Sequence, residues 1–328
     1  MSKDALVSLS VYFNEEQMVG KGEDSALRIT DGPNAALIAT MDGCGGAGAQ
    51  VYAKANNMSG ARISAEHVGI ALHRWFSENQ YGLVGTDGKT AEMLAAEMKV
   101  AINNELTEQY EIVGEEESAV QSRMARILPS TLAAMLAEVT ETNMVRCISF
   151  WAGDSRTFLF RASGLQQTSR DDIRGHRDPF AALINDGRLS NLVSLSAEYE
   201  IHTTETVLTE PFIILTASDG CFSYFRSPME FEWTILDTLK KSPTPQHWED
   251  NLRDLFGFYA SDDFTMNIAV LGFSNWKAVQ NAYSPRWCEF YEKYYKPMEH
   301  FLTAEDQQSH YSLWLQYKQE YMPEDGSF

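Results

Sequence analysis

The chain has 328 residues, of which 44% are hydrophobic and 12% aromatic, so it can bury a full core and is not a disordered or fibrous protein. Its 46 acidic residues outnumber the 26 basic ones and give a formal charge of −20, which disfavours nucleic-acid binding because phosphates need a basic surface. No apolar run approaches the roughly 20 residues that span a bilayer, so we expect no membrane partner.

The number and spacing of the cysteines are typical of a protein from a reducing compartment, the cytoplasm. The first 16 residues contain neither a continuous apolar region nor the small-residue cleavage site of an export signal. Cys44, Cys147, Cys221 and Cys288 are far apart and form no Cys-x-x-Cys pair. We therefore expect reduced thiols in a cytoplasmic protein rather than a disulfide framework.

Apolar patterns predict the elements in chain order. Alternating or continuous apolar runs indicate strands over residues 5–13, 35–41, 132–139, 144–151, 157–160, 193–201, 212–217 and 265–271. Helical spacing indicates a helix that follows an N-cap at Ser64, and further helices around 93–102, 229–240 and 248–259. Because hairpins outnumber strand-helix alternations, we expect an α+β fold with antiparallel sheets covered by helices.

The C-terminal part differs in composition from the rest. Residues 273–328 carry 14 of the 38 aromatic side chains, and aromatic and aliphatic residues recur at helical spacing from Trp287 to Phe301 and from Tyr311 to Met322. We therefore divide the chain into residues 1–273 and an aromatic-rich helical extension, residues 274–328. Two alternatives stay open for the extension: it completes the core of the preceding domain, or it docks a partner.

Two predicted buried strands each end in the same dipeptide. The strand over 35–41 runs into Asp42-Gly43, and the strand over 212–217 is followed, after Ser218, by Asp219-Gly220. A carboxylate at the end of an apolar strand is partly withdrawn from water, which is costly unless a cation or a donor compensates it. Glycine permits close approach of the backbone, so the Gly43 carbonyl could itself act as a ligand.

Further carboxylates lie just before predicted strands or in the turn that links two of them. Glu23-Asp24 precedes the strand that ends at Asp42, Asp262-Asp263 precedes the strand at 265, and Asp154 occupies a hairpin turn. Taken singly, each is an ordinary turn or cap residue. Taken together, converging carboxylates without histidine or cysteine ligands suit a hard divalent cation, Mg²⁺ or Mn²⁺.

The order of these motifs resembles that of a known family. The segments are 22–24, 42–46, 153–156, 217–220 and 261–265, and their order and spacing are similar to those of the PPM family of metal-dependent, type 2C serine/threonine protein phosphatases. The resemblance covers residues 5–272. It implies a four-layer α-β-β-α sandwich of two antiparallel sheets flanked by helices, with the metal ions at one edge of the sheets, to which this chain adds C-terminal helices.

Position by position, the resemblance also implies a ligand set for two Mn²⁺ or Mg²⁺ ions and a weaker third. Asp42 would bridge two ions, with Asp219 and Asp262 as further ligands of the first, and these three would be the catalytic carboxylates. Glu23 and the Gly43 carbonyl would bind the second ion. The same comparison implies that Asp24 holds a metal-bound water and that Asp154, with Asp219, binds the third ion.

The chain departs from the family pattern at several positions. Val19 stands where the family has a phosphate-holding arginine, and Lys21 nearby could replace it as a point charge. Cys44 stands where many animal members have a histidine, and Asp263 where asparagine is usual. His176 lies in a basic segment at the position of the family's flap, which makes it a candidate for substrate contact.

The activity implied by the resemblance is hydrolysis of phosphoserine and phosphothreonine on proteins by a water that two metal ions activate, in opposition to a Ser/Thr kinase. No side-chain nucleophile is needed for this chemistry. Two alternatives stay open: a pseudophosphatase or phosphoprotein-binding module, favoured by Val19 and Cys44, and a small-molecule phosphohydrolase. The charge of −20 leads us to expect a preference for basic or neutral segments around the phosphoresidue.

Overall fold

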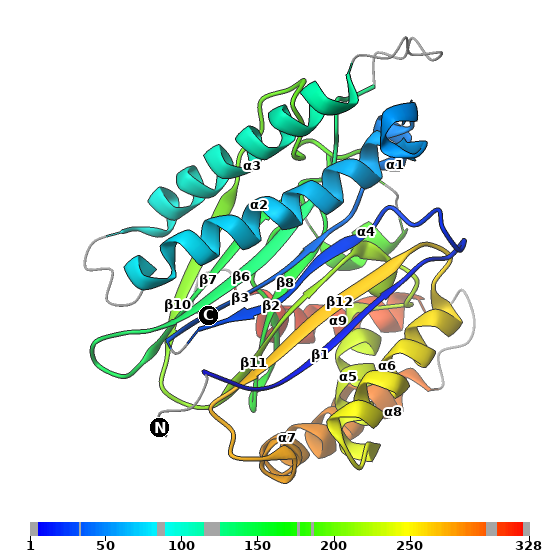
Figure 1. The fold of residues 1–328 in the computed structure, drawn as a ribbon. Helices are drawn as coiled ribbons and strands as arrows, with labels where there is room; N and C mark the ends of the chain where they lie inside the picture. Colours follow the sequence, from blue (N-terminus) through cyan, green and yellow to red (C-terminus); the bar gives the residue numbers. More distant parts are fainter. Residues whose placement is uncertain are drawn as a thin grey trace.

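The computed structural model describes residues 6–32, 34–83, 89–114, 125–175, 178–184, 187–299 and 307–323, and it shows two antiparallel sheets packed face to face (Figure 1). In order across the first sheet lie β1 (Val7–Glu15), β12 (Phe264–Leu271), β11 (Phe212–Ala217), β8 (Arg156–Arg161) and β9 (Gly164–Gln167). Across the second lie β10 (His202–Leu208), β7 (Val145–Ala152), β6 (Leu132–Val139), β3 (Ala35–Met41) and β2 (Ser25–Asp31). The predicted fold class is confirmed.

The central strands of the two sheets are buried on both faces. Every residue of β3 and of β11 is buried, as expected for uninterrupted apolar runs. Between the sheets, the hydroxyls of Thr40 and Thr216 lie 2.9 Å apart, and the Asn267 side chain donates to the Ala39 carbonyl at 2.7 Å. These polar contacts hold β3 against β11 and β12. They lie near the C-terminal ends of β3 and β11, which Asp42 and Asp219 follow in the chain.

Helices cover the outer face of each sheet. The second sheet carries α2 (Gly60–Leu83) and α3 (Ala91–Val113), and the first carries α5 (Pro228–Lys241), α6 (Pro245–Tyr259) and α7 (Trp276–Phe290) (Figure 1). Side-chain caps begin α5 and α6: Ser227 accepts from the Glu230 N–H, and Thr244 accepts from the His247 N–H. Each cap is followed by a proline, which suits the first helical position.

Several short elements and a final 15-residue helix complete the described part of the chain. They are α1 (Gly45–Gly48), the pair β4 (Val51–Tyr52) and β5 (Met58–Ser59) with η1 (Ala53–Ala55) between them, α4 (Pro179–Ile184), η2 (Asp219–Cys221), the π-helical turn η3 (Tyr291–Tyr295), α8 (Lys296–Met298) and α9 (Gln307–Tyr321). Among the described residues, no helix is both long and apolar enough to cross a membrane. All four cysteines are described, and all are free thiols.

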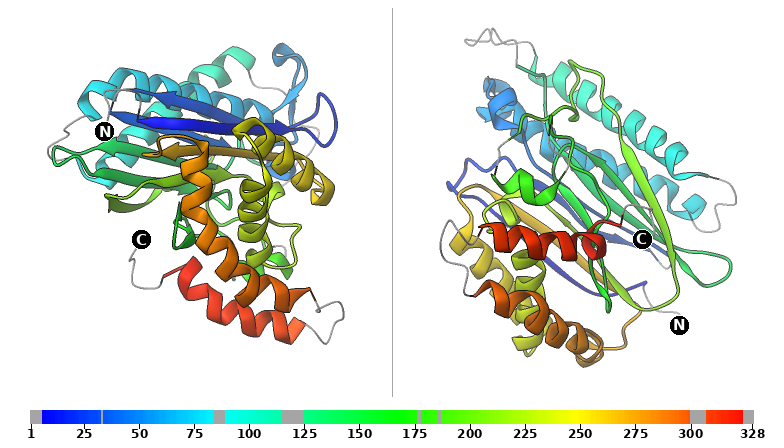
Figure 2. Two further views of the ribbon diagram at one scale, coloured as in Figure 1. Left: turned by 90° about the horizontal axis from the view of Figure 1, so that it is seen from below. Right: turned by 180° about the vertical axis from the view of Figure 1, so that it is seen from behind.

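The C-terminal helices pack on the body of the molecule. Tyr283, Tyr294 and Trp314 are each at most 1% exposed and share one hydrophobic cluster with Phe158 and Ile213 of the first sheet. Figure 2 shows α7 and α9 (orange and red) against the side of the first sheet. Of the two alternatives for the extension, the structure therefore supports completion of the core. The predicted contribution of Phe301 lies outside the described residues.

The structure corrects several predicted elements. Residues 193–201 form no strand, and the strand instead runs over β10, whose alternating polar residues occupy the edge of its sheet. Ser64 is no N-cap, because α2 already begins at Gly60 and the buried Ser64 hydroxyl donates to Ser130 at 2.9 Å. Strands β2 and β9 were not predicted.

Candidate functional site

The site is built around Asp42, which follows β3 directly. Its N–H donates to Thr131 Oγ1 at 3.0 Å, and its carbonyl accepts the Thr131 N–H at 2.7 Å. Thr131 Oγ1 also lies 2.6 Å from Ser155 Oγ, in the turn between β7 and β8 that carries Asp154. A single threonine thus ties together two of the segments that bear candidate ligands.

Carboxylates from four other positions surround Asp42. Burial raises the pKa of Asp42 well above its usual value, and the charges of Asp24, Asp219, Asp154 and Asp262 raise it further. Burial and the charge of Asp262 likewise raise the pKa of Asp219 to about 6, while a hydrogen bond with Asp42 opposes this shift. These effects mean that the other four carboxylates lie within electrostatic reach of Asp42, which follows β3, while Asp219 follows β11.

Asp24 and Asp154 are two further carboxylates of this cluster. The Ser218 hydroxyl donates to Asp24 Oδ2 at 2.7 Å, and burial nevertheless raises the pKa of Asp24 to about 7. Burial and then the charge of Asp219 raise the pKa of Asp154 well above its usual value, with Arg156 acting in the opposite direction. Both carboxyls are therefore costly to keep ionised without a compensating cation.

Glu23 and Gly43 are in direct contact through their backbones. The Gly43 N–H donates to the Glu23 carbonyl at 3.2 Å, and the Ser59 hydroxyl donates to the Glu23 carboxylate. A Cβ on Gly45 would lie 2.0 Å from Glu23 Oε2, so the glycine at 45 leaves the space that this carboxylate occupies. Burial raises the pKa of Glu23, and the charges of Asp263 and Asp262 add to the effect.

Asp262 and Asp263 are adjacent in sequence but differ in exposure and in their hydrogen-bond partners. Asp262 is exposed, and its Oδ1 accepts the N–H of Asp263 at 2.8 Å. Asp263 turns away to hold the loop between β1 and β2: its Oδ1 accepts the Gln17 N–H and its Oδ2 accepts the Glu23 N–H, both at 2.7 Å. Asp263 thus positions the backbone of Glu23.

The donor chemistry of this cluster fits a hard divalent cation. It offers only carboxylate and carbonyl oxygens, and half-buried carboxylates that raise one another's pKa need either protons or cations to coexist. Within the described residues, no group of three or more His, Cys, Asp or Glu side chains is already arranged so that it could hold a metal ion. The fit therefore rests on ligand type and convergence, not on a preformed cage.

An arginine that the sequence interpretation missed lies at the loop between β1 and β2. Val19 is 97% exposed and Lys21 is also exposed. Arg62 of α2 reaches the same loop, where its Nη1 donates to the Gly20 carbonyl at 3.4 Å, and its charge lowers the pKa of Glu23. It also pairs with Glu66 at 2.9 Å. Because the contact with Gly20 spans 42 positions, no local motif indicates it.

A second missed cation is Arg156, which is 2% exposed. Its guanidinium holds Asp171 through two hydrogen bonds of 3.0 and 2.6 Å and lies 3.9 Å from the ring centroid of Phe222. Its charge opposes the upward pKa shifts of both Asp154 and Asp219. It belongs to the 153–156 motif, so the sequence did contain a signal for it.

Two further residues singled out in the sequence are Cys44 and His176, and the structure describes only the first of them. Cys44 is half-buried beside the cluster, and burial, followed by the charges of Asp42 and Asp154, raises the pKa of its thiol well above the usual value. That environment disfavours the reactive thiolate. His176 lies outside the described residues.

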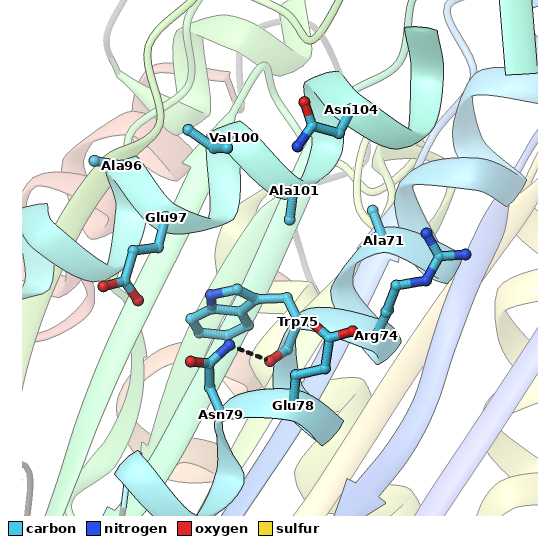
Figure 3. Close-up of a pocket in the computed structure, with 10 residues that line it drawn as sticks. All are labelled: Ala71, Arg74, Trp75, Glu78, Asn79, Ala96, Glu97, Val100, Ala101 and Asn104. Carbon is cyan, nitrogen blue, oxygen red and sulfur yellow. Dashed lines mark hydrogen bonds between the residues drawn. The ribbon is translucent and has the colours of Figure 1, made fainter. Parts of the chain in front are cut away.

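A groove elsewhere on the molecule contains none of these carboxylates. It encloses about 520 Å³ between α2 and α3 and is lined in part by Ala71, Trp75 and Val100 (Figure 3). The Asn79 side chain there donates to the Trp75 carbonyl at 2.9 Å. The groove lies on the outer helical layer, so it is separate from the carboxylate cluster at the strand ends.

Comparison with solved structures shows that this chain shares its fold with PPM serine/threonine phosphatases. Stp1 from Staphylococcus aureus superposes with a TM-score of 0.58 at 19% identity, covering 83% of this chain and 98% of Stp1. PstP/Ppp from Mycobacterium tuberculosis gives 0.55 at 19%, covering 82% and 100%. The catalytic domain of PstP in complex with two manganese ions gives 0.51 at 21%, covering 80% and 98%. No protein-family model and no curated protein sequence matches the chain.

Proposed function

We propose that the protein is a metal-dependent phosphatase that hydrolyses phosphoserine and phosphothreonine on proteins. The observation that carries this proposal is the convergence of Asp24, Asp154, Asp219 and Asp262 on Asp42, at the ends of the central strands. The fold that presents these carboxylates is shared with serine/threonine phosphatases, one of them in complex with two manganese ions.

In this proposal the carboxylate cluster holds two Mn²⁺ or Mg²⁺ ions and a weaker third. Asp42, Asp219 and Asp262 would hold the first, and Glu23 with the Gly43 carbonyl the second. Asp154 would serve the third together with Asp219. Such ions lower the pKa of a water that attacks phosphorus and neutralise charge on the phosphoryl oxygens.

The remaining residues would orient the ligands and the substrate. Asp263 holds the Glu23 backbone, and Ser218 holds Asp24 in place to accept a hydrogen bond from water. Arg156 stabilises the ionised forms of Asp154 and Asp219. Arg62 reaches from α2 to the loop that carries Lys21, and both would supply positive charge for the phosphate. The guanidinium is the better partner because its donors match two phosphoryl oxygens.

Residues 1–273 would be the phosphatase domain and residues 274–328 an extension, which agrees with neighbours that cover 80–83% of this chain and nearly all of their own. The enzyme would act in the cytoplasm against an opposing Ser/Thr kinase. The charge of −20 would favour basic or neutral segments around the phosphoresidue.

The test compares turnover of a phosphothreonine peptide, a generic aryl phosphate and free phosphometabolites, with Mn²⁺ and with chelator. We expect peptide turnover that chelator abolishes and that Asp42→Asn reduces by about a thousandfold or more, because removing the central ligand removes metal catalysis. Asp254→Asn, an exposed carboxylate on α6, is the matched control and should retain full activity. Metal binding without turnover would instead favour a pseudophosphatase, and preference for free metabolites a small-molecule phosphohydrolase.

A further inference from the structure

Helix α9 contacts the long connection between β9 and β10, residues 168–201, just before α4. The Trp314 indole Nε1 donates to Asp178 Oδ1 at 3.0 Å, and the Lys318 ammonium lies 2.9 Å from Asp178 Oδ2. The ring of Phe180 stacks on that of Trp314, with centroids 6.2 Å apart and planes 19° from parallel. Figure 2 shows α9 (red) beside α4 (green) in the view from behind. One carboxylate and one ring thus fix α4 to the C-terminal helix.

A second contact joins the end of α9 to the start of the same connection. Arg170 Nη2 donates to the carbonyl of Pro323 at 3.3 Å. Arg170 Nη1 donates to the carbonyls of Gln167 and Ser169, both at 3.1 Å. The guanidinium therefore bridges the residues that leave β9 and the residues that follow α9.

The connection is also bonded to the turn that carries Asp154. The Asp172 N–H donates to the Gly153 carbonyl at 3.0 Å, and the Gly153 N–H donates back to Asp172 Oδ2 at 3.0 Å. On the other side of Asp154, Arg156 is held by Asp171 through two hydrogen bonds. Asp171 and Asp172 thus fix both flanks of Asp154.

We propose that α9 is a positioning element of the carboxylate cluster, and that Trp314 and Lys318 are its positioning residues. By holding the connection at Asp178 and Arg170, α9 limits the movement of residues 170–172 and so fixes the turn around Asp154. The consequence for metal binding rests on the proposed function, whereas the mechanical link does not. Residues that orient metal ligands commonly change affinity by about tenfold or more when they are removed.

The experiment uses the full chain with Lys318→Met and Trp314→Phe, which keep the size or the ring but remove the donors to Asp178. Gln316→Met, an exposed position on the same helix, is the control. Hydrogen-deuterium exchange of the metal-free protein should become several-fold faster in the peptide that covers residues 151–156 in both variants and stay unchanged in the control. Mn²⁺ affinity, measured calorimetrically, should fall by about tenfold in both variants.

The proposal is overturned if the faster exchange stays confined to α9 and α4 while residues 151–156 exchange as in the unaltered protein. If Trp314→Phe fails to fold, Lys318→Met decides, because it removes a partly exposed ammonium and leaves the core intact. If the unaltered protein binds no Mn²⁺, the metal proposal fails by itself, and the exchange of residues 151–156 still tests the link.

Discussion

Arg286 of α7 and Glu232 of α5 form an ion pair that is withdrawn from water, with side chains 2% and 0% exposed. Two hydrogen bonds of 2.8 and 3.2 Å join them, and the Tyr317 hydroxyl of α9 donates to the same carboxylate. A buried charge that loses its partner is strongly destabilising. This pair therefore couples the C-terminal helices to the stability of the body.

Replacement of Arg286 by methionine should lower the free energy of unfolding by about 3–5 kcal/mol, because it leaves the Glu232 carboxylate buried without a cation. Urea denaturation measures the change. The double variant Arg286→Met with Glu232→Gln should recover most of it, since glutamine is neutral and still accepts from Tyr317. Lys277→Met, an exposed position on α7, is the control, and an equal loss there would contradict the account.

The contact between Asp178 and α9 should make stability depend on pH. Burial alone would raise the pKa of Asp178, but hydrogen bonds from Lys318 and Trp314 outweigh it and lower the pKa below the usual value. A carboxyl whose folded pKa is depressed stabilises above its unfolded pKa, about 3.9, and this contribution is lost as the pH falls through the folded pKa.

The expected result is that Asp178→Asn lowers the melting temperature at neutral pH, and that the difference from the unaltered protein shrinks below about pH 4. Differential scanning calorimetry across this range provides the measurement. A difference of constant size down to about pH 3 would show that the charge of Asp178 contributes nothing.

Arg62 and Lys21 offer two candidates for the positive charge at the phosphate. We expect Arg62→Gln to weaken inhibition by inorganic phosphate by about tenfold, because a charge-assisted hydrogen bond is worth at least that much. Lys21→Gln should change it by less than about twofold, since exposed point charges are well screened. The measurement is the inhibition constant for phosphate of each variant at a fixed Mn²⁺ concentration. A larger change in Lys21→Gln than in Arg62→Gln would contradict the role of Arg62.

The cysteines should differ in reactivity towards iodoacetamide. Cys288 is exposed, whereas burial and the neighbouring carboxylates raise the pKa of the Cys44 thiol. We therefore expect rapid modification at Cys288 and slow modification at Cys44, measured by peptide mass spectrometry of the metal-free protein. Cys288→Ser should remove the rapid phase. Rapid modification of Cys44 would instead support a thiol that senses oxidants.

The sequence predicted the central strands well because their burial leaves a simple pattern. Strands β3, β6 and β11 have the predicted bounds, since each is an apolar run between turn residues. Strand β10 was placed wrongly because an edge strand exposes one face and reads as polar, His202-Thr203-Thr204-Glu205. Ser64 was mistaken for the cap because the serine that caps α2 lies earlier: the Ser59 hydroxyl, just before Gly60, accepts the Arg62 N–H at 3.1 Å.

For the site, motif order indicated which carboxylates to consider but not how each one is held. The resemblance already selected Asp262 rather than Asp263 as a ligand, but the role of Asp263 emerges only from its backbone donors at Gln17 and Glu23, which are remote in sequence. The sequence could not indicate Arg62 as a site residue for the same reason, because its approach to Gly20 depends on how α2 packs.

The most direct measurement is anomalous diffraction from a crystal soaked in Mn²⁺, collected at the manganese absorption edge. The account predicts two strong peaks within coordination distance of Asp42, one of them shared with Asp219 and the other with Glu23, and their loss in a crystal of Asp42→Asn. Manganese bound elsewhere, or no peak beside Asp42 at saturating Mn²⁺, would contradict it.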